Sequence, residues 1–185
     1  AILAIVHPGD EVIVLEPCYD SYVPNIELAG GKVVRVPLTP GTFRPDFDKI
    51  SAAINPKTRA ILINSPHNPS ATIWSSADML RLQEILAPTD VLLISDEVYE
   101  HMVFDGQQHE SAARFPALAQ RAFIVSSFGN TSVLPRRPSA RSAAGTERGS
   151  PVSISSSAGA ALALRISASA SPPRRKAASF LRRAA

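Results

Sequence analysis

Residues 59–95 read RAILINSPHNPSATIWSSADMLRLQEILAPTDVLLIS, and this stretch decides the fold. It begins and ends with apolar runs, residues 59–64 and 91–95, each of the length of a buried strand. Between them, Ser75 and Asp78 have the spacing of a helix capping box. The segment after the box has one apolar face, formed by Met79, Leu82, Ile85 and Leu86. We therefore expect a strand–helix–strand unit with two parallel strands.

The same alternation continues on both sides of this unit. Apolar runs rich in β-branched residues predict further strands at residues 11–15, 32–37 and 122–126. Helical patterns occupy residues 21–29 and 46–54. Strands that are apolar on both faces and alternate with helices imply a mostly parallel sheet covered by helices. The predicted fold class is α/β.

The charges divide the chain after Gly129. Residues 1–129 carry 15 acidic and 9 basic side chains, a net charge of −6. Residues 130–185 carry 1 acidic and 10 basic side chains, a net charge of +9, with 12 Ser and 13 Ala. The overall charge of +3 is therefore the sum of two unrelated compositions. We predict a globular domain over residues 1–129 and a disordered, low-complexity Ser/Ala/Arg/Pro tail over residues 130–185.

The sequence argues against several classes of protein. No run of 18 apolar residues is present, so we expect no membrane span. Cys18 is a single cysteine and no secretory pattern opens the chain, which favours a cytoplasmic location. Neither His67 nor His101 has a metal-ligand spacing to other candidate ligands, so we expect no metal site. Residues 1–6 have the pattern of the end of a helix, and we expect the chain to begin inside a domain.

Polar side chains follow four of the predicted strands where each strand ends. In open parallel sheets, ligands bind beyond these carboxyl ends. The segments at these four strand ends place aromatic rings, an amide, a carboxylate, a phenol and hydroxyls at one edge of the sheet. This edge is therefore the candidate site. The four segments are EPCYDSY at 16–22, NSPHNP at 64–69, SDEVYE at 95–100 and SSFG at 126–129.

These four strings, in this order and spacing, resemble the large domain of class I/II aminotransferases of fold type I, which use pyridoxal 5′-phosphate. The resemblance is closest to the methionine and kynurenine aminotransferase branch and covers nearly all of residues 1–129. It implies transfer of an amino group from a methionine-like or aromatic amino acid to a 2-oxo acid, by a parent enzyme that is a homodimer. A carbon–sulfur lyase of the same fold shares the cofactor pocket and stays an alternative.

The resemblance assigns cofactor contacts to five residues. Asp96 would keep the pyridine nitrogen protonated, as the chemistry of this cofactor demands. Asn68 and Tyr99 would hydrogen-bond the 3′ oxygen of the ring, and Asn68 would also contact the substrate carboxylate. Tyr19 would stack on the pyridine face. Ser127 would bind the phosphate.

Each assignment has a structural alternative. Asp96 could instead cap a following helix, and Asn68 could form a plain Asn-Pro turn. Packing or loop roles are the alternatives for Tyr19, Tyr22, Tyr99 and Ser127. His67 and Trp74 are read as structural residues.

The resemblance breaks at residue 130. In the family, a serine, an apolar residue and a small residue precede the Schiff-base lysine. This chain reads Ser127, Phe128, Gly129 and then Asn130. An amide cannot hold the cofactor as an imine or transfer the proton. No catalytic residue is therefore retained, and we expect the chain to lack transaminase activity.

Residues 130–185 lack the family pattern that should follow. We interpret them as out-of-frame sequence that begins near codon 130. A different hypothesis is that a basic tail binds nucleic acid through Arg and Lys clusters at 136–137, 174–176 and 182–183. We favour the first interpretation, because the basic residues are sparse and no aromatic residues accompany them for stacking on bases.

Overall fold

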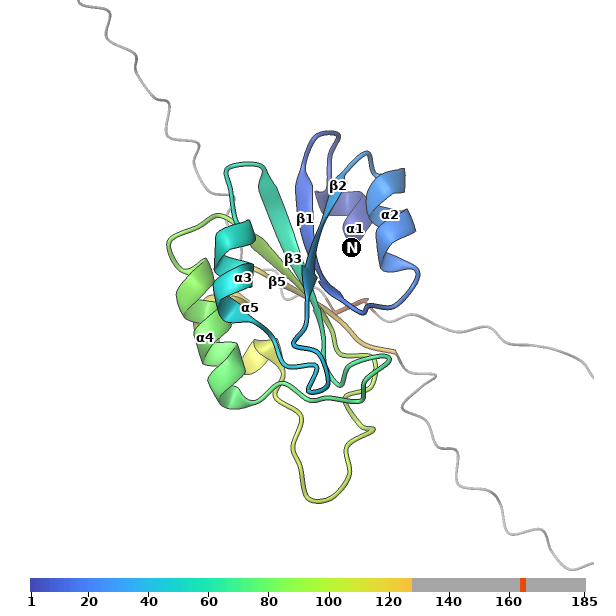
Figure 1. Cartoon of the computed structure of the whole chain (residues 1–185), viewed down its shortest axis with the longest axis vertical. Coiled ribbons are helices and arrows are strands. Elements are labelled where there is room, and N and C mark those ends of the chain that lie inside the picture. The colour runs from blue at the N-terminus through green and yellow to red at the C-terminus, as the bar shows by residue number, and fades with distance from the viewer. Residues whose placement is uncertain (128–163, 166–185) are drawn as a thin grey trace, which may run out of the picture.

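The computed structural model describes residues 1–127 and the backbone of residues 164–165 (Figure 1). Asn130 and nearly all of the predicted tail, residues 130–185, lie outside these ranges. The predictions made for them therefore stay predictions.

A sheet of six strands in the order β2-β1-β3-β4-β5-β6 forms the centre of the described structure. The first five strands are parallel, as the sequence predicts, and β6 is antiparallel to β5. The strands are β1 (Glu11–Glu16), β2 (Lys32–Pro37), β3 (Thr58–Asn64), β4 (Leu92–Asp96), β5 (Ala122–Val125) and β6 (Leu164–Arg165).

Strand β6 was not predicted. Its two residues pair with Ile124 and Val125 of β5. The outer edge of β5 offers free backbone donors and acceptors, and such an edge can accept a further strand.

Helices cover both faces of the sheet (Figure 1). Val12 and Val14 of β1 pack on one face with α1 (Ile2–Ile5) and α2 (Tyr22–Leu28). Ile13 and Leu15 point to the opposite face. That face is covered by α3 (Phe47–Ala53), α4 (Ser76–Leu86), the 3₁₀ helix η1 (Ala112–Arg114) and α5 (Pro116–Ala119). The two hydrophobic cores explain why the strands are apolar on both sides.

The helix boundaries follow the local signals in the sequence. The Ser75 Oγ accepts from the Asp78 amide at 3.2 Å, and the Asp78 carboxylate accepts from the Ser75 amide at 2.7 Å, so the predicted capping box is present. Arg44 also pairs with Asp78. Gly30, just after α2, has a φ of +78°, a conformation that glycine adopts at little cost.

No helix in residues 1–127 is both long enough and apolar enough to cross a membrane. Several large apolar side chains are exposed, including Leu28 at 74% and Phe104 at 71%.

The strand register determines the site. Asn64 at the end of β3 lies opposite Asp96 at the end of β4, and Asp96 lies opposite Val125 at the end of β5. Because these strands are parallel, the segments that follow them leave the sheet at the same edge.

Candidate functional site

A cavity of about 360 Å³ lies at the carboxyl edge of the sheet. Segments that follow β1, β3, β4 and β5 line it, although they are distant in sequence. All five residues that the sequence assigned to the cofactor contribute to its wall: Tyr19, Asn68, Asp96, Tyr99 and Ser127. Tyr22, to which the sequence assigned no cofactor contact, also lines the cavity.

Asp96 is the last residue of β4 and its carboxylate is held by two neutral donors. The Tyr22 hydroxyl donates to Oδ2 at 2.5 Å, and the Val98 amide donates to Oδ1 at 3.2 Å. A turn, rather than a helix, follows Asp96 in the chain. The alternative that Asp96 caps a helix is therefore wrong.

The Asp96 carboxylate has no cationic partner among residues 1–127. Burial raises its pKa, hydrogen bonds from Tyr22 and Val98 oppose this effect, and the charge of Glu97 adds to it. A partly buried carboxylate of raised basicity, paired only with neutral donors, is suited to a protonated ring nitrogen. The donor set therefore fits the pyridine ring that the sequence predicts here.

Tyr22 is the functional candidate that sequence reasoning missed. Burial, followed by the charge of Asp96, raises the pKa of its phenol well above the usual range, so Tyr22 stays protonated and donates. Only its place in a helical pattern was visible in the sequence. The contact with Asp96 spans 74 positions and depends on how α2 packs against the sheet.

Asn68 and Tyr99 lie together on another part of the cavity wall. The Asn68 Nδ2 lies 3.4 Å from the Tyr99 hydroxyl oxygen, so both side chains can reach one ligand oxygen. Asn64 supports the pair, since its Oδ1 accepts from the Asn68 amide at 2.7 Å. The Asn64 Nδ2 donates to the backbone carbonyl of Asp96 at 2.9 Å. Asn64 thus links the segments that carry Asn68 and Asp96.

Tyr19 and Ser127 complete the predicted set. Tyr19 is 45% exposed and meets the Tyr22 ring edge-on, with centroids 5.6 Å apart and planes at 77°. Ser127 lines the cavity two residues beyond the end of β5. Both residues are at the cavity, and their contacts with a cofactor stay predictions.

His67 and Trp74 have the structural roles that we expected. His67 Nε2 donates to the Pro17 carbonyl at 2.9 Å, and its Nδ1 lies 2.6 Å from the Ser70 hydroxyl. Trp74 is 4% exposed and packs edge-on against Phe47. His67 therefore joins the loops after β1 and β3, which carry Tyr19 and Asn68.

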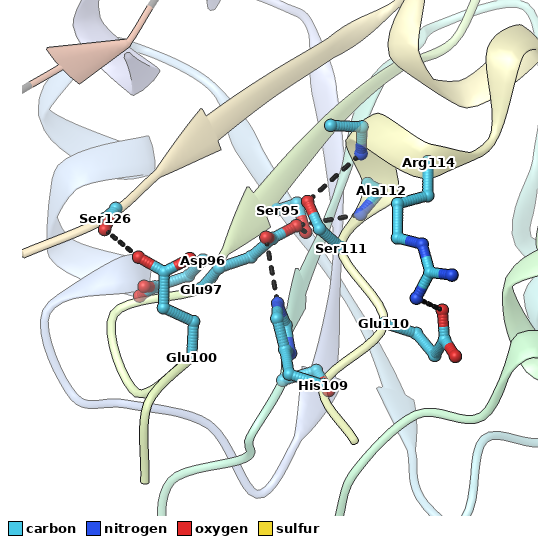
Figure 2. Close-up of polar contacts among 12 residues, drawn as sticks. Ser95, Asp96, Glu97, Glu100, His109, Glu110, Ser111, Ala112, Arg114 and Ser126 are labelled. Atoms are coloured by element: carbon cyan, nitrogen blue, oxygen red, sulfur yellow. Dashed lines mark hydrogen bonds and ion pairs between the residues drawn. The ribbon is translucent and has the colours of Figure 1, made fainter. Parts of the chain in front are cut away.

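A second polar cluster lies beside the site (Figure 2). Ligand atoms of Glu97, Glu100 and His109 lie within 4.8 Å of one another. His109 Nε2 is hydrogen-bonded to Glu97 at 3.0 Å, and Glu100 accepts from Ser126 at 2.6 Å. We interpret the cluster as a hydrogen-bonded network, and the absence of a metal site stays a prediction.

Comparison with known proteins identifies the class to which this fold and site belong. The sequence model of the family described as aminotransferase class I and II matches residues 1–168. The chain belongs to this family, whose members are generally pyridoxal-phosphate-dependent dimers that act on amino and oxo acids. The match extends beyond Gly129, where the recognisable motifs end.

Individual relatives agree with the methionine and kynurenine branch. A methionine aminotransferase of Escherichia coli is 49% identical over 131 residues, covering 71% of this chain and 34% of the relative. A solved E. coli structure with methionine aminotransferase function matches with a TM-score of 0.68 at 48% identity, covering 70% and 34% of the two chains. A probable kynurenine–oxoglutarate transaminase of Saccharomyces cerevisiae is 38% identical over 141 residues, covering 70% and 32%. This chain thus spans about one third of the length of these relatives.

Proposed function

We propose that residues 1–127 form part of the pyridoxal 5′-phosphate site of an aminotransferase that acts on a methionine-like or aromatic amino acid and a 2-oxo acid. One observation carries the proposal: a single cavity gathers the five predicted residues around Asp96, which lacks a cationic partner in the described chain. The names of the E. coli and yeast relatives support the donor class. A homodimeric assembly and a cytoplasmic location belong to the same proposal.

Each residue has a definite task in this proposal. Bound pyridoxal phosphate supplies an electron sink for the substrate carbon. Asp96 holds a proton on the ring nitrogen, and Tyr22 holds Asp96 in place. Asn68 and Tyr99 bind the 3′ oxygen, and Asn68 also binds the substrate carboxylate. Tyr19 stacks on the face of the pyridine ring, and Ser127 binds the phosphate.

Because residue 130 is Asn and not Lys, the function that we propose for the 185-residue chain is cofactor binding without catalysis. An amide nitrogen is not a nucleophile towards the cofactor aldehyde, so we propose that the 185-residue chain does not catalyse transamination. We also retain the interpretation of residues 130–185 as out-of-frame sequence. The coding DNA tests it: a second frame should encode a lysine at this point and then a family-like continuation, and no such frame would contradict the interpretation.

Binding of pyridoxamine 5′-phosphate tests the proposed site without needing a lysine. Calorimetric titration of the full chain should give one saturable site, and Asp96→Asn should weaken it about tenfold or more. Glu84→Asn is the control, because Glu84 is exposed on α4 and pairs with Arg81. No saturable binding, or equal binding by Asp96→Asn, would contradict the proposed function.

Borohydride treatment of the chain with pyridoxal phosphate tests the role of residue 130. We expect no covalently retained cofactor in the unmodified chain and specific retention at residue 130 in Asn130→Lys. Thr131→Lys, with a lysine one position later, is the matched control. Specific retention by the unmodified chain would contradict the assignment of Asn130.

A further inference from the structure

Glu97 is a buried carboxylate next to Asp96, and the proposed function assigns no role to Glu97. Its exposed fraction is 1%, and its oxygens accept hydrogen bonds from three elements of the chain. The donors include the Ser95 hydroxyl at 2.8 Å, the Ala112 amide at 3.0 Å and His109 Nε2 at 3.0 Å. Figure 2 shows the Glu97 side chain directed from the end of β4 towards His109 and Ala112.

These contacts hold together the two ends of the loop of residues 97–112, which carries Tyr99 of the candidate site. Residues 97–112 leave the sheet after β4, carry Tyr99 along the cavity and return to the Glu97 carboxylate. The Glu97 amide donates to the Val125 carbonyl at 2.8 Å, so the same residue also holds the start of the loop against β5. Glu97 thus fixes the backbone directly after Asp96.

Glu97 is ionised in this network. Burial alone would raise its pKa, but hydrogen bonds from His109, Ser111, Ala112 and Ser95 outweigh burial and hold the pKa below its usual range. His109 is 9% exposed and its Nε2 faces the carboxylate, so Nε2 carries the donated proton. The negative charge beside Asp96 increases the basicity of the Asp96 carboxylate.

We propose that Glu97 is a positioning residue that acts through Asp96: it fixes the Asp96 carboxylate and strengthens its attraction for a protonated ring nitrogen. This inference rests on the proposed function. It predicts a specific kind of defect, because loss of Glu97 should weaken binding only of ligands that have the ring nitrogen. A residue with a merely structural role would affect all ligands of the cavity equally.

Two ligands separate these outcomes: pyridoxamine 5′-phosphate and its 1-deaza analogue, which has carbon in place of the ring nitrogen. The unmodified full chain should prefer the first. Glu97→Gln keeps the size of the side chain and removes its charge, and we expect it to reduce this preference about tenfold. His109→Gln should reduce the preference in the same direction. Glu110→Gln is the matched control, since Glu110 pairs with Arg114 at 2.8 Å, and should leave the preference unchanged.

An unchanged preference in folded Glu97→Gln and His109→Gln would overturn the inference. If neither variant folds while Glu110→Gln does, Glu97 is purely structural and the inference is also overturned. Failure of the proposed function is a separate result, because the unmodified chain would then bind neither ligand or would bind both equally.

Discussion

Replacement of Tyr22 by Phe removes one hydroxyl from the candidate site and preserves the packing of the ring. Tyr22 donates to Asp96 Oδ2 at 2.5 Å, and the Val98 amide is the other donor to that carboxylate. A hydrogen bond to a charged group contributes about 1.5–3 kcal/mol. Loss of this donor should therefore raise the pKa of Asp96 further above its usual range in Tyr22→Phe.

The same change should make stability more dependent on pH. The folded-state pKa of Asp96 is raised by burial, so protonation favours the folded state, and this contribution is lost as pH rises through the folded pKa. Tyr22→Phe raises that pKa further. The variant should therefore lose about 1.5–3 kcal/mol of unfolding free energy at neutral pH, and less well below a pH of about 4, where Asp96 is protonated in both states.

Carboxyl ¹³C shifts of Asp96 measured against pH give the pKa directly, and urea unfolding at several pH values gives the free energy. Tyr19→Phe is the matched control, since the Tyr19 ring meets Tyr22 edge-on and its hydroxyl makes no hydrogen bond to Asp96. An Asp96 pKa that stays constant or falls in Tyr22→Phe would refute this reasoning.

Two further changes test the fold. Ser75→Ala removes the capping box of α4 and should cost about 1 kcal/mol in urea unfolding, whereas Ser76→Ala, one position inside the helix, should cost much less; equal costs would contradict the cap. Burial lowers the pKa of His67, against the opposing hydrogen bond to Pro17, so the unfolded chain binds a proton more readily. Unfolding free energy should therefore fall as pH drops below about 6.5, and His67→Gln should flatten this dependence relative to the exposed-residue control His101→Gln. Identical pH profiles for the two variants would show that His67 does not titrate in this way.

The fold was predictable because its signals are local. The runs at β3 and β4 are apolar on both faces, and Ser75 and Asp78 mark the start of the helix between them. Strand β6 could not be predicted, since two residues have no period and are placed by the free edge of β5.

The candidate site was predictable in its members and not in its internal contacts. The strings at the strand ends identified Asp96 and Asn68, which line one cavity. The contact of Tyr22 with Asp96 and that of His109 with Glu97 join side chains from different segments. Such pairs depend on how a helix or a returning loop packs against the sheet, which no single-strand pattern encodes.

The most direct test of the proposed site is a map of backbone amide NMR shifts as pyridoxamine 5′-phosphate is added to the full chain. The largest changes should fall at the carboxyl edge of the sheet, on residues around Tyr19, Asn68, Asp96 and Ser127. Residues at the opposite edge, where β1 and β3 begin at Glu11 and Thr58, should not change. Changes that are absent, or that centre on the opposite edge or on the basic tail, would contradict the proposal that this cavity binds the cofactor.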